Sequence, residues 1–309
     1  MKTANIVRSK KKINMSTGRI VFIVLMLTIP FLKWAIFWLY VNINSIMLAF
    51  RDARTLKFSF NNFVEVWDSV TRNGELGLAL KNTGIFFVSN NIFLFMLNLI
   101  MSYFLYKQIK GYKIFRIIFY LPVIISGVAM VTVYSEFIKP EGPLGFILKQ
   151  FNINLPERGL LATDTTALPT IMFYCIWTGF TTNVIIFSSS LSRIPIDVLE
   201  YARIEGCGPV RELFNIIIPL IFPMISTMLI FSLTGLFGAS GPILLFTNGE
   251  YNTTTISFWI FKQVYGSGAI GGSGSYGVVS AAGLCFTIIG FPIIIFVKWM
   301  IERVPTVEY

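Results

Sequence analysis

The sequence predicts an all-α polytopic membrane protein with six transmembrane helices and both termini in the cytoplasm. Of the 309 residues, 55% are hydrophobic and only 13% are charged, and the mean hydropathy is +0.72. Soluble domains carry about 25% charged residues, so this chain has too little charge to coat a soluble surface of its size. Long apolar runs recur along the chain, and Lys and Arg gather beside them.

Six apolar runs each reach the roughly 20 residues that a helix needs to cross a hydrocarbon core. The basic segment 1–19 precedes them, and the first run continues from Ile20 to about Phe50 without a cleavage site of signal-peptide type. An uncleaved first span is therefore expected. We expect a transmembrane domain over 20–300 and a cytoplasmic tail over 301–309. The predicted spans are 20–50, 83–106, 117–137, 168–191, 219–246 and 278–300.

The distribution of Lys and Arg orients these helices. With the N-terminus inside, the predicted cytoplasmic segments are more than twice as dense in Lys and Arg as the outer ones. The positive-inside rule favours this orientation and explains the net charge of +10 without nucleic acid. The outer segments are about 30 residues long, and loops of that length usually fold or bind something. We expect short amphipathic elements there, and a flexible Gly/Ser-rich loop over 266–277.

The residue types exclude most catalytic chemistry. The chain has no His, which removes His-dependent triads, His-ligated metal sites and histidine proton relays. Its three Cys lie far apart and form no disulfide framework. No GxxxxGK[ST] sequence is present to hold nucleotide phosphates. We therefore expect no catalytic residue, no metal and no cofactor bound by this chain, and no enzymatic activity of its own.

The most informative segment is the predicted cytoplasmic loop 192–219, which reads as two short helices with a break between them. Pro195 and Pro209 suit first helical turns, and Gly206 and Gly208 fit a helix stop. A helix of two or three turns is marginal in water, so it needs support from a groove on a partner protein or from the inner leaflet. Both possibilities stay open. The second helix should present one apolar face, formed by Val210, Leu213, Phe214, Ile217 and Ile218.

This loop resembles the EAA loop of binding-protein-dependent ABC importers, whose pattern is E-A-A-x3-G-x9-I-x-L-P. The segment 200–219 matches every spacing, with Tyr201 in place of the first alanine and Ile218 in place of leucine. Further stretches resemble sugar permeases of the oligosaccharide (LplB-like) subgroup. They are Lys81-Asn82-Thr83 and the segments 115–122, 142–145 and 255–261.

The resemblance implies the permease fold of type I ABC importers in a bacterial cell membrane. It also implies a second homologous permease, two ATPase subunits that bind ATP and Mg²⁺, and an extracellular solute-binding lipoprotein. In such complexes the EAA helix sits in a cleft of an ATPase subunit. The resemblance assigns this coupling role to Glu200, Tyr201, Ala202, Arg203, Glu205, Gly206 and Pro219. We expect Glu200 to act as an electrostatic anchor, Ala202 to permit close approach, and Pro219 to begin the next span.

Polar and aromatic residues within the predicted spans are candidates for the substrate path. They are Asn90, Asn91, Tyr174, Trp177, Thr182 and Asn183. Hydrogen bonding between helices and aromatic packing are the alternative explanations. Lys33 lies within the first apolar run, either as a lining residue or ion-pair partner, with Glu136 as the candidate, or with its ammonium extended to the interface.

We expect the transported solute to be a carbohydrate, specifically an oligosaccharide. One alternative is an ABC importer permease for a non-sugar solute such as glycerol phosphate. The other is an ion-coupled secondary transporter, although acids are scarce in the predicted spans.

Overall fold

The computed structural model describes residues 17–52, 55, 57–72, 74–153, 155–266 and 274–304, and these residues are helical or irregular apart from one isolated bridge between Arg51 and Phe58. Five helices are long and apolar enough to cross a membrane, and a bent helix pair raises the number to six. The continuous spans are Thr17–Ala49, Glu75–Tyr106, Ala167–Leu191, Pro209–Leu233 and Tyr276–Ile301.

Several spans combine α-helix with a π-helical turn. The first contains α1 (Thr17–Trp34), η1 (Ala35–Tyr40) and α2 (Val41–Ala49); the second contains α4 (Glu75–Val88), η2 (Ser89–Leu94) and α5 (Phe95–Tyr106). The bent pair is α6 (Tyr112–Ile124) and α7 (Gly127–Phe137), and the next span is α9 (Ala167–Leu191). The last two contain α11 (Pro209–Glu212), η3 (Leu213–Ile217) and α12 (Ile218–Leu233), and then α15 (Gly274–Ile301).

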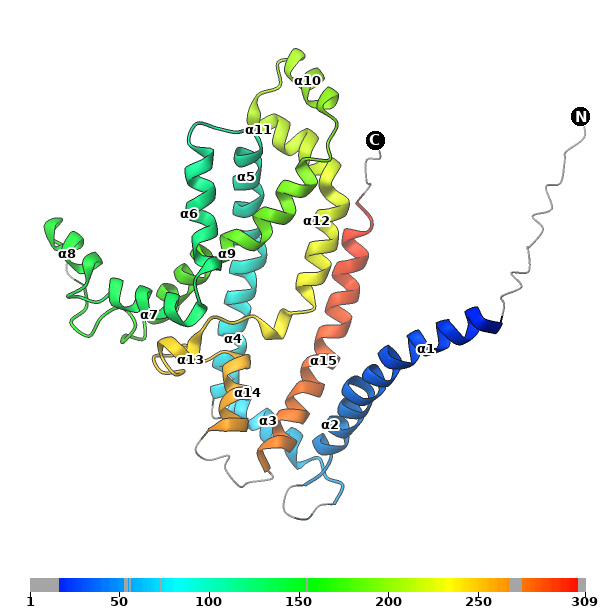
Figure 1. Cartoon of the computed structure of the whole chain (residues 1–309). Coiled ribbons are helices and arrows are strands. Elements are labelled where there is room, and N and C mark those ends of the chain that lie inside the picture. The colour runs from blue at the N-terminus through cyan, green and yellow to red at the C-terminus, as the bar shows by residue number, and fades with distance from the viewer. Residues whose placement is uncertain are drawn as a thin grey trace, which may run out of the picture.

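Short elements connect these spans at the two ends of the bundle. They are α3 (Asn61–Thr71), α8 (Pro143–Gln150), α10 (Ile196–Ile204), η4 (Leu236–Gly238), α13 (Ile243–Phe246) and α14 (Ile256–Tyr265). In Figure 1, α10 and α11 lie at the same end as the last residues of α15, whereas α3 and α14 lie at the opposite end. Short helices do form in the segments predicted to be outer loops: they are α3, α8 and α14, and α3 buries Asn62 and Val66 while it exposes Val64 and Trp67.

The prediction of an unbroken third span was wrong. Its two halves meet at 104°, because Pro122 lacks an N–H for the helix ladder and the backbone turns extended at Ile125 and Ser126, with ψ of 144° and 132°. In Figure 1, α7 accordingly runs sideways from the foot of α6 toward α8.

Four further boundaries differ from the prediction. The second span begins at Glu75 rather than at residue 83, and the fifth covers Pro209–Leu233 rather than 219–246. The fifth ends early because its helix stops at Leu233 and gives way to a 3₁₀ turn at Leu236–Gly238. Residues 274–277, expected in a flexible loop, begin α15, whereas 267–273 lie outside the described residues.

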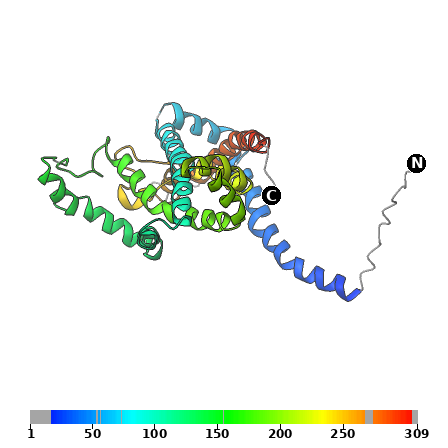
Figure 2. The same ribbon diagram turned by 90° about the horizontal axis from the view of Figure 1, so that it is seen from above.

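The N-terminal part of the first span makes little contact with the rest of this chain, whereas its last part, α2, packs against α15. No residue of α1 is buried, and Figures 1 and 2 show α1 leaning away from the bundle. Lys33 is exposed on this helix. Glu136 pairs with Lys139 at 2.5 Å, so the ion pair considered between Lys33 and Glu136 is absent here. Exposed Lys33 fits the alternative of a side chain that extends to the interface.

Candidate functional site

The helix α10 stops at the predicted glycine. Gly206 has a φ of +74°, in the left-handed region that glycine adopts without steric cost. Its N–H donates to the Arg203 carbonyl at 3.0 Å, and the Cys207 N–H donates to the Ala202 carbonyl at 2.9 Å. These two bonds form a complete Schellman cap. Gly208, also expected as a stop, is extended with φ −70° and precedes Pro209, which begins α11.

The two faces of α10 differ in exposure. Leu199 and Ala202 are buried, and Leu199 joins a core cluster built from α5, α9, η3 and α12. Ala202 therefore faces this chain's own bundle, where its small side chain permits close approach of α10. Three exposed apolar residues of α10, together with one of α11, form what we call the α10 apolar face. They are Ile196, Tyr201 and Ile204 of α10 and Val210 of α11, exposed at 67%, 70%, 81% and 72%.

Charged side chains surround the α10 apolar face. Glu200, Arg203 and Glu205 are all exposed, so these predicted coupling residues lie on the solvent side of the loop together with Tyr201. Sequence reasoning found the segment and most of its outward residues. It did not show that Ala202 faces the bundle, because spacing alone does not reveal which side of a short helix meets the bundle.

The second predicted helix of the loop is the start of the fifth span. Leu213 and Ile217 are buried, but Val210 and Phe214 are exposed at 72% and 46%, so the predicted apolar face is only partly covered. Pro219 lies in the first turn of α12. It does not begin the span, because α11 and the π-helical η3 already continue into α12 from Pro209.

The substrate-path candidates fall into two groups. Asn90 and Asn91 lie on η2, which packs against α9, the helix that carries Asn183. All three are partly buried, and the Asn91 amide donates to the carbonyl of Phe87 at 3.0 Å within its own helix. The side chain of Thr182 lies outside the described residues.

Tyr174 and Trp177 belong to an aromatic cluster that joins α7, α9 and α13. Tyr174 is 5% exposed, and its ring lies 5.1 Å from that of Tyr134 and 5.0 Å from that of Phe246. Trp177, but not Tyr174, borders a cavity of about 370 Å³ whose other lining residues are Val133, Tyr134, Phe137 and Phe173. Tyr174 is thus a packing residue, and Trp177 stays a candidate for ligand contact.

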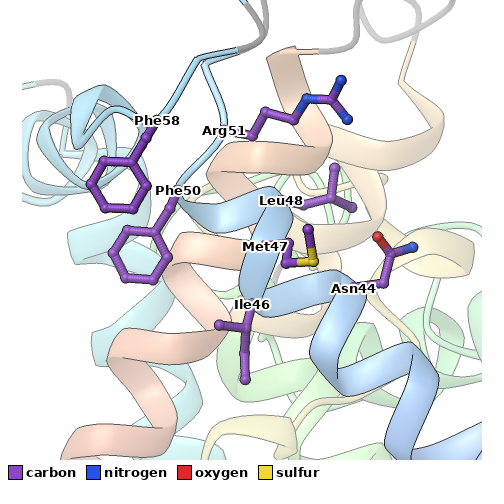
Figure 3. Close-up of a pocket in the computed structure, with 7 residues that line it drawn as sticks. All are labelled: Asn44, Ile46, Met47, Leu48, Phe50, Arg51 and Phe58. Carbon is purple, nitrogen blue, oxygen red and sulfur yellow. The ribbon is translucent and has the colours of Figure 1, made fainter.

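A second hollow of about 460 Å³ lies at the end of the first span, far from α10. Figure 3 shows its lining, including the rings of Phe50 and Phe58, which stack at 5.4 Å. None of the predicted site residues borders it.

Two polar contacts escaped the sequence analysis. Lys107 and Glu212 form an ion pair of 2.6 Å across 105 positions of sequence. Asn82 and Thr83, noted only as part of a family resemblance, bond to the backbone of the segment before α14 and its first residue. Lys107 looked like one more cytoplasmic positive charge, so no signal in a single sequence paired it with Glu212.

The sequence is similar to known transport proteins. A family model described as binding-protein-dependent transport system inner membrane component matches residues 4–305. The multiple sugar-binding transport system permease protein MsmF of Streptococcus mutans is 24% identical over 275 residues, which cover 88% of this chain and 92% of MsmF. The sn-glycerol-3-phosphate transport system permease protein UgpA of Yersinia enterocolitica is 26% identical over 208 residues, 65% of this chain and 68% of UgpA.

Solved structures share the fold. A chain of a bacterial ABC transporter involved in the import of the acidic polysaccharide alginate superposes with a TM-score of 0.78 at 20% identity, covering 94% of this chain and 98% of that one. A chain of the alginate transporter in complex with an alginate pentasaccharide-bound periplasmic protein gives 0.77 at 21% identity, covering 92% and 95%. Since the family model matches nearly the whole sequence, this chain belongs to the inner membrane components of binding-protein-dependent transport systems and is a multi-pass membrane protein.

Proposed function

We propose that this chain is a permease subunit of an ABC importer that carries an oligosaccharide delivered by an extracellular binding lipoprotein. In this proposal it pairs with a second homologous permease, and two ATPase subunits bind ATP and Mg²⁺. Both termini lie in the cytoplasm. The importer then alternates between outward-open and inward-open states as the ATPase pair closes and reopens. The names of MsmF and of the alginate transporter support a carbohydrate as the solute.

The α10 apolar face carries the proposal. Its four side chains are exposed at 67–81% on a short segment at one end of the bundle. Large apolar residues that gather on an exposed segment mark an interaction site. The helix is too short to be stable alone in water, so a bound partner would also support its outward side.

The charges on α10 favour a protein groove over the inner leaflet. Helices that lie on membranes are rich in Lys and Arg on their polar side. Around the α10 apolar face the exposed charges are instead balanced, with acids at Asp197, Glu200 and Glu205 and bases at Arg193, Arg203 and Arg211. Because this segment lacks an excess of bases, an anionic leaflet would attract it little. We therefore assign the face to a cleft of the ATPase subunit.

The test is ATP-dependent uptake by the complete complex in proteoliposomes, with Ile204→Asp as the variant. We expect Ile204→Asp to lower ATPase copurification and uptake at least about tenfold, since roughly 1.4 kcal/mol of lost binding is tenfold. Ile114→Asp is the matched control, because Ile114 is 65% exposed near the start of α6. Uptake by the chain without ATPase subunits would overturn the proposal, and so would equal loss in both variants.

A non-sugar solute is the second candidate, favoured by the similarity to UgpA, whose name states sn-glycerol-3-phosphate transport. The same proteoliposomes, supplied with the cognate binding protein, separate the two. Uptake of a labelled oligosaccharide that excess glycerol 3-phosphate does not inhibit supports the carbohydrate. The reverse pattern supports the phosphate ester.

A further inference from the structure

The second span, Glu75–Tyr106, is bonded to other segments at both of its ends. It is one continuous helix from α4 through η2 to α5. The side chains that fasten it belong to Asn82 and Thr83 near its start and to Lys107 directly after its end. The helix rises about 37 Å between Asn82 and Lys107, at 1.5 Å per residue.

The outer fastening holds the segment that leads into α14. Asn82 is 2% exposed, and its amide donates to the carbonyls of Asn252 and Thr254 at 2.7 and 2.8 Å. The hydroxyl of Thr83, which is 1% exposed, accepts from the Ile256 N–H at 2.9 Å. Because these bonds reach backbone groups, the loop before α14 and the first residue of that helix must follow any displacement of α4.

The inner fastening is a buried ion pair. Lys107 Nζ lies 2.6 Å from one carboxylate oxygen of Glu212 and donates to the other at 2.8 Å. The two side chains are 19% and 3% exposed. The ammonium also lies over the Tyr103 ring, 5.6 Å from its centroid. The pair therefore ties the end of α5 to α11, which follows α10 directly in the chain.

The helix ends favour this pair. Lys107 caps the C-terminal end of α5, where the helix dipole favours a positive charge. Glu212 lies in the first turn of the long helix that begins at Pro209, where the dipole favours a negative charge. A buried pair is sensitive in one specific way: loss of one partner leaves an uncompensated charge, whereas joint replacement by apolar residues is often tolerated. The Lys107–Glu212 pair therefore fixes the position of α11 relative to α5.

Apolar packing supports the same connection. Tyr103 of α5, Leu199 of α10 and Leu213 of η3 belong to one buried cluster. A displacement of α10 would therefore be transmitted to the end of the second span by packed side chains as well as by the ion pair.

We propose that the second span acts as a rod that carries the displacement of α10 to the loop before α14, and that Lys107 and Glu212 are the positioning residues at its driven end. The inference rests on the proposed function, since the ATPase supplies the displacement. Packed elements move as units rather than deforming continuously, so a rod bonded at both ends shifts both loops together.

The experiment measures the outer loop while the ATPase works. The complete complex, with the three native Cys replaced by Ala, carries Glu250→Cys, an exposed position in the outer loop. A membrane-impermeant maleimide then reports the labelling rate without nucleotide and with ATP plus vanadate. We expect a nucleotide-dependent change in rate that Lys107→Met reduces at least about fivefold, the lower range of coupling between sites. Lys107→Arg, which keeps the charge, should retain most of the change.

A matched pair supplies the control. Lys298 forms an ion pair of 3.6 Å with Glu302, and the two side chains are 52% and 58% exposed. Lys298→Met removes this pair and should leave the change in labelling rate within about twofold of the wild type, since exposed pairs contribute little. Should Lys107→Met fail to assemble with the ATPase, Lys107→Met/Glu212→Met replaces it and is expected to assemble and regain the change.

The outcomes separate the two proposals. A complex that imports solute with ATP but shows no nucleotide-dependent labelling at residue 250 overturns the rod. So does a Lys107→Met complex with a wild-type response, or equal losses in Lys107→Met and Lys298→Met. A wild-type complex without ATP-dependent uptake overturns the proposed function instead.

Discussion

At the scale of single residues, Gly206 decides how α10 meets the rest of the loop. Its left-handed conformation allows the chain to leave the helix and start α11 three residues later. A Cβ atom at this position would meet no heavy atom within 4 Å, so a side chain would fit in space and would strain only the backbone. For residues other than glycine this conformation costs about 1–2 kcal/mol.

This geometry leads to a prediction for Gly206→Asp. We expect the complex to assemble and hydrolyse ATP while uptake falls at least about tenfold, because a shift of roughly 1.4 kcal/mol changes an equilibrium tenfold and the strained cap misplaces α10. Uptake and ATPase rates in proteoliposomes check this. Gly208→Asp is the control, since Gly208 is extended and exposed. Normal uptake with Gly206→Asp would contradict a coupling role for this turn.

Particular residues show which features of the structure could be predicted from the sequence. The end of α10 at Gly206 and the start of α11 at Pro209 could be predicted because they depend on the backbone preferences of glycine and proline, which do not require contacts with distant segments. The inward position of Ala202 and the pairing of Lys107 with Glu212 depend on contacts between distant segments. The bend between α6 and α7 was missed for a related reason. Membrane helices often tolerate proline within the span, so Pro122 alone did not distinguish a kink from a break.

At the scale of elements, the aromatic cluster fixes the broken third span to the rest of the bundle. Tyr134 of α7, Tyr174 of α9 and Phe246 of α13 pack with ring centroids 5.0–5.8 Å apart. The Tyr134 hydroxyl also donates to the Thr170 carbonyl of α9 at 3.1 Å. Since α7 turns away from α6, these contacts are what hold it against α9.

Truncation of the central ring should therefore destabilise the fold. We expect Tyr174→Ala to cost about 3–5 kcal/mol, as large aromatic truncations in cores do, and to lower the melting temperature of the purified protein. The neighbouring Phe173 is 64% exposed, so Phe173→Ala should change stability by less than about 1 kcal/mol. Thermal unfolding followed by size-exclusion chromatography measures both. Equal melting temperatures for the two variants would show that the cluster does not hold α7.

At the scale of the whole molecule, the two ends of the bundle carry different kinds of segment. The end with α10 and α11 presents the α10 apolar face, whereas the opposite end carries α3, α14 and the stacked rings of Phe50 and Phe58. The second span connects the two ends through Lys107 and Asn82. The α1 part of the first span leans away from the bundle and has no buried residue, so lipid or another chain must cover it in the membrane.

The sidedness of these ends is the last prediction. In cells that express a chain without native Cys, Ile204→Cys on α10 should react with a membrane-impermeant maleimide only after permeabilisation, because the density of Lys and Arg predicts that this end lies in the cytoplasm. Glu250→Cys before α14 and Phe58→Cys after the first span should react in intact cells. All three positions are exposed in this chain, and the cells express it without ATPase subunits, so burial does not explain a difference between them. Labelling of Ile204→Cys in intact cells would place α10 beyond the reach of any cytoplasmic ATPase and would remove the physical basis for coupling.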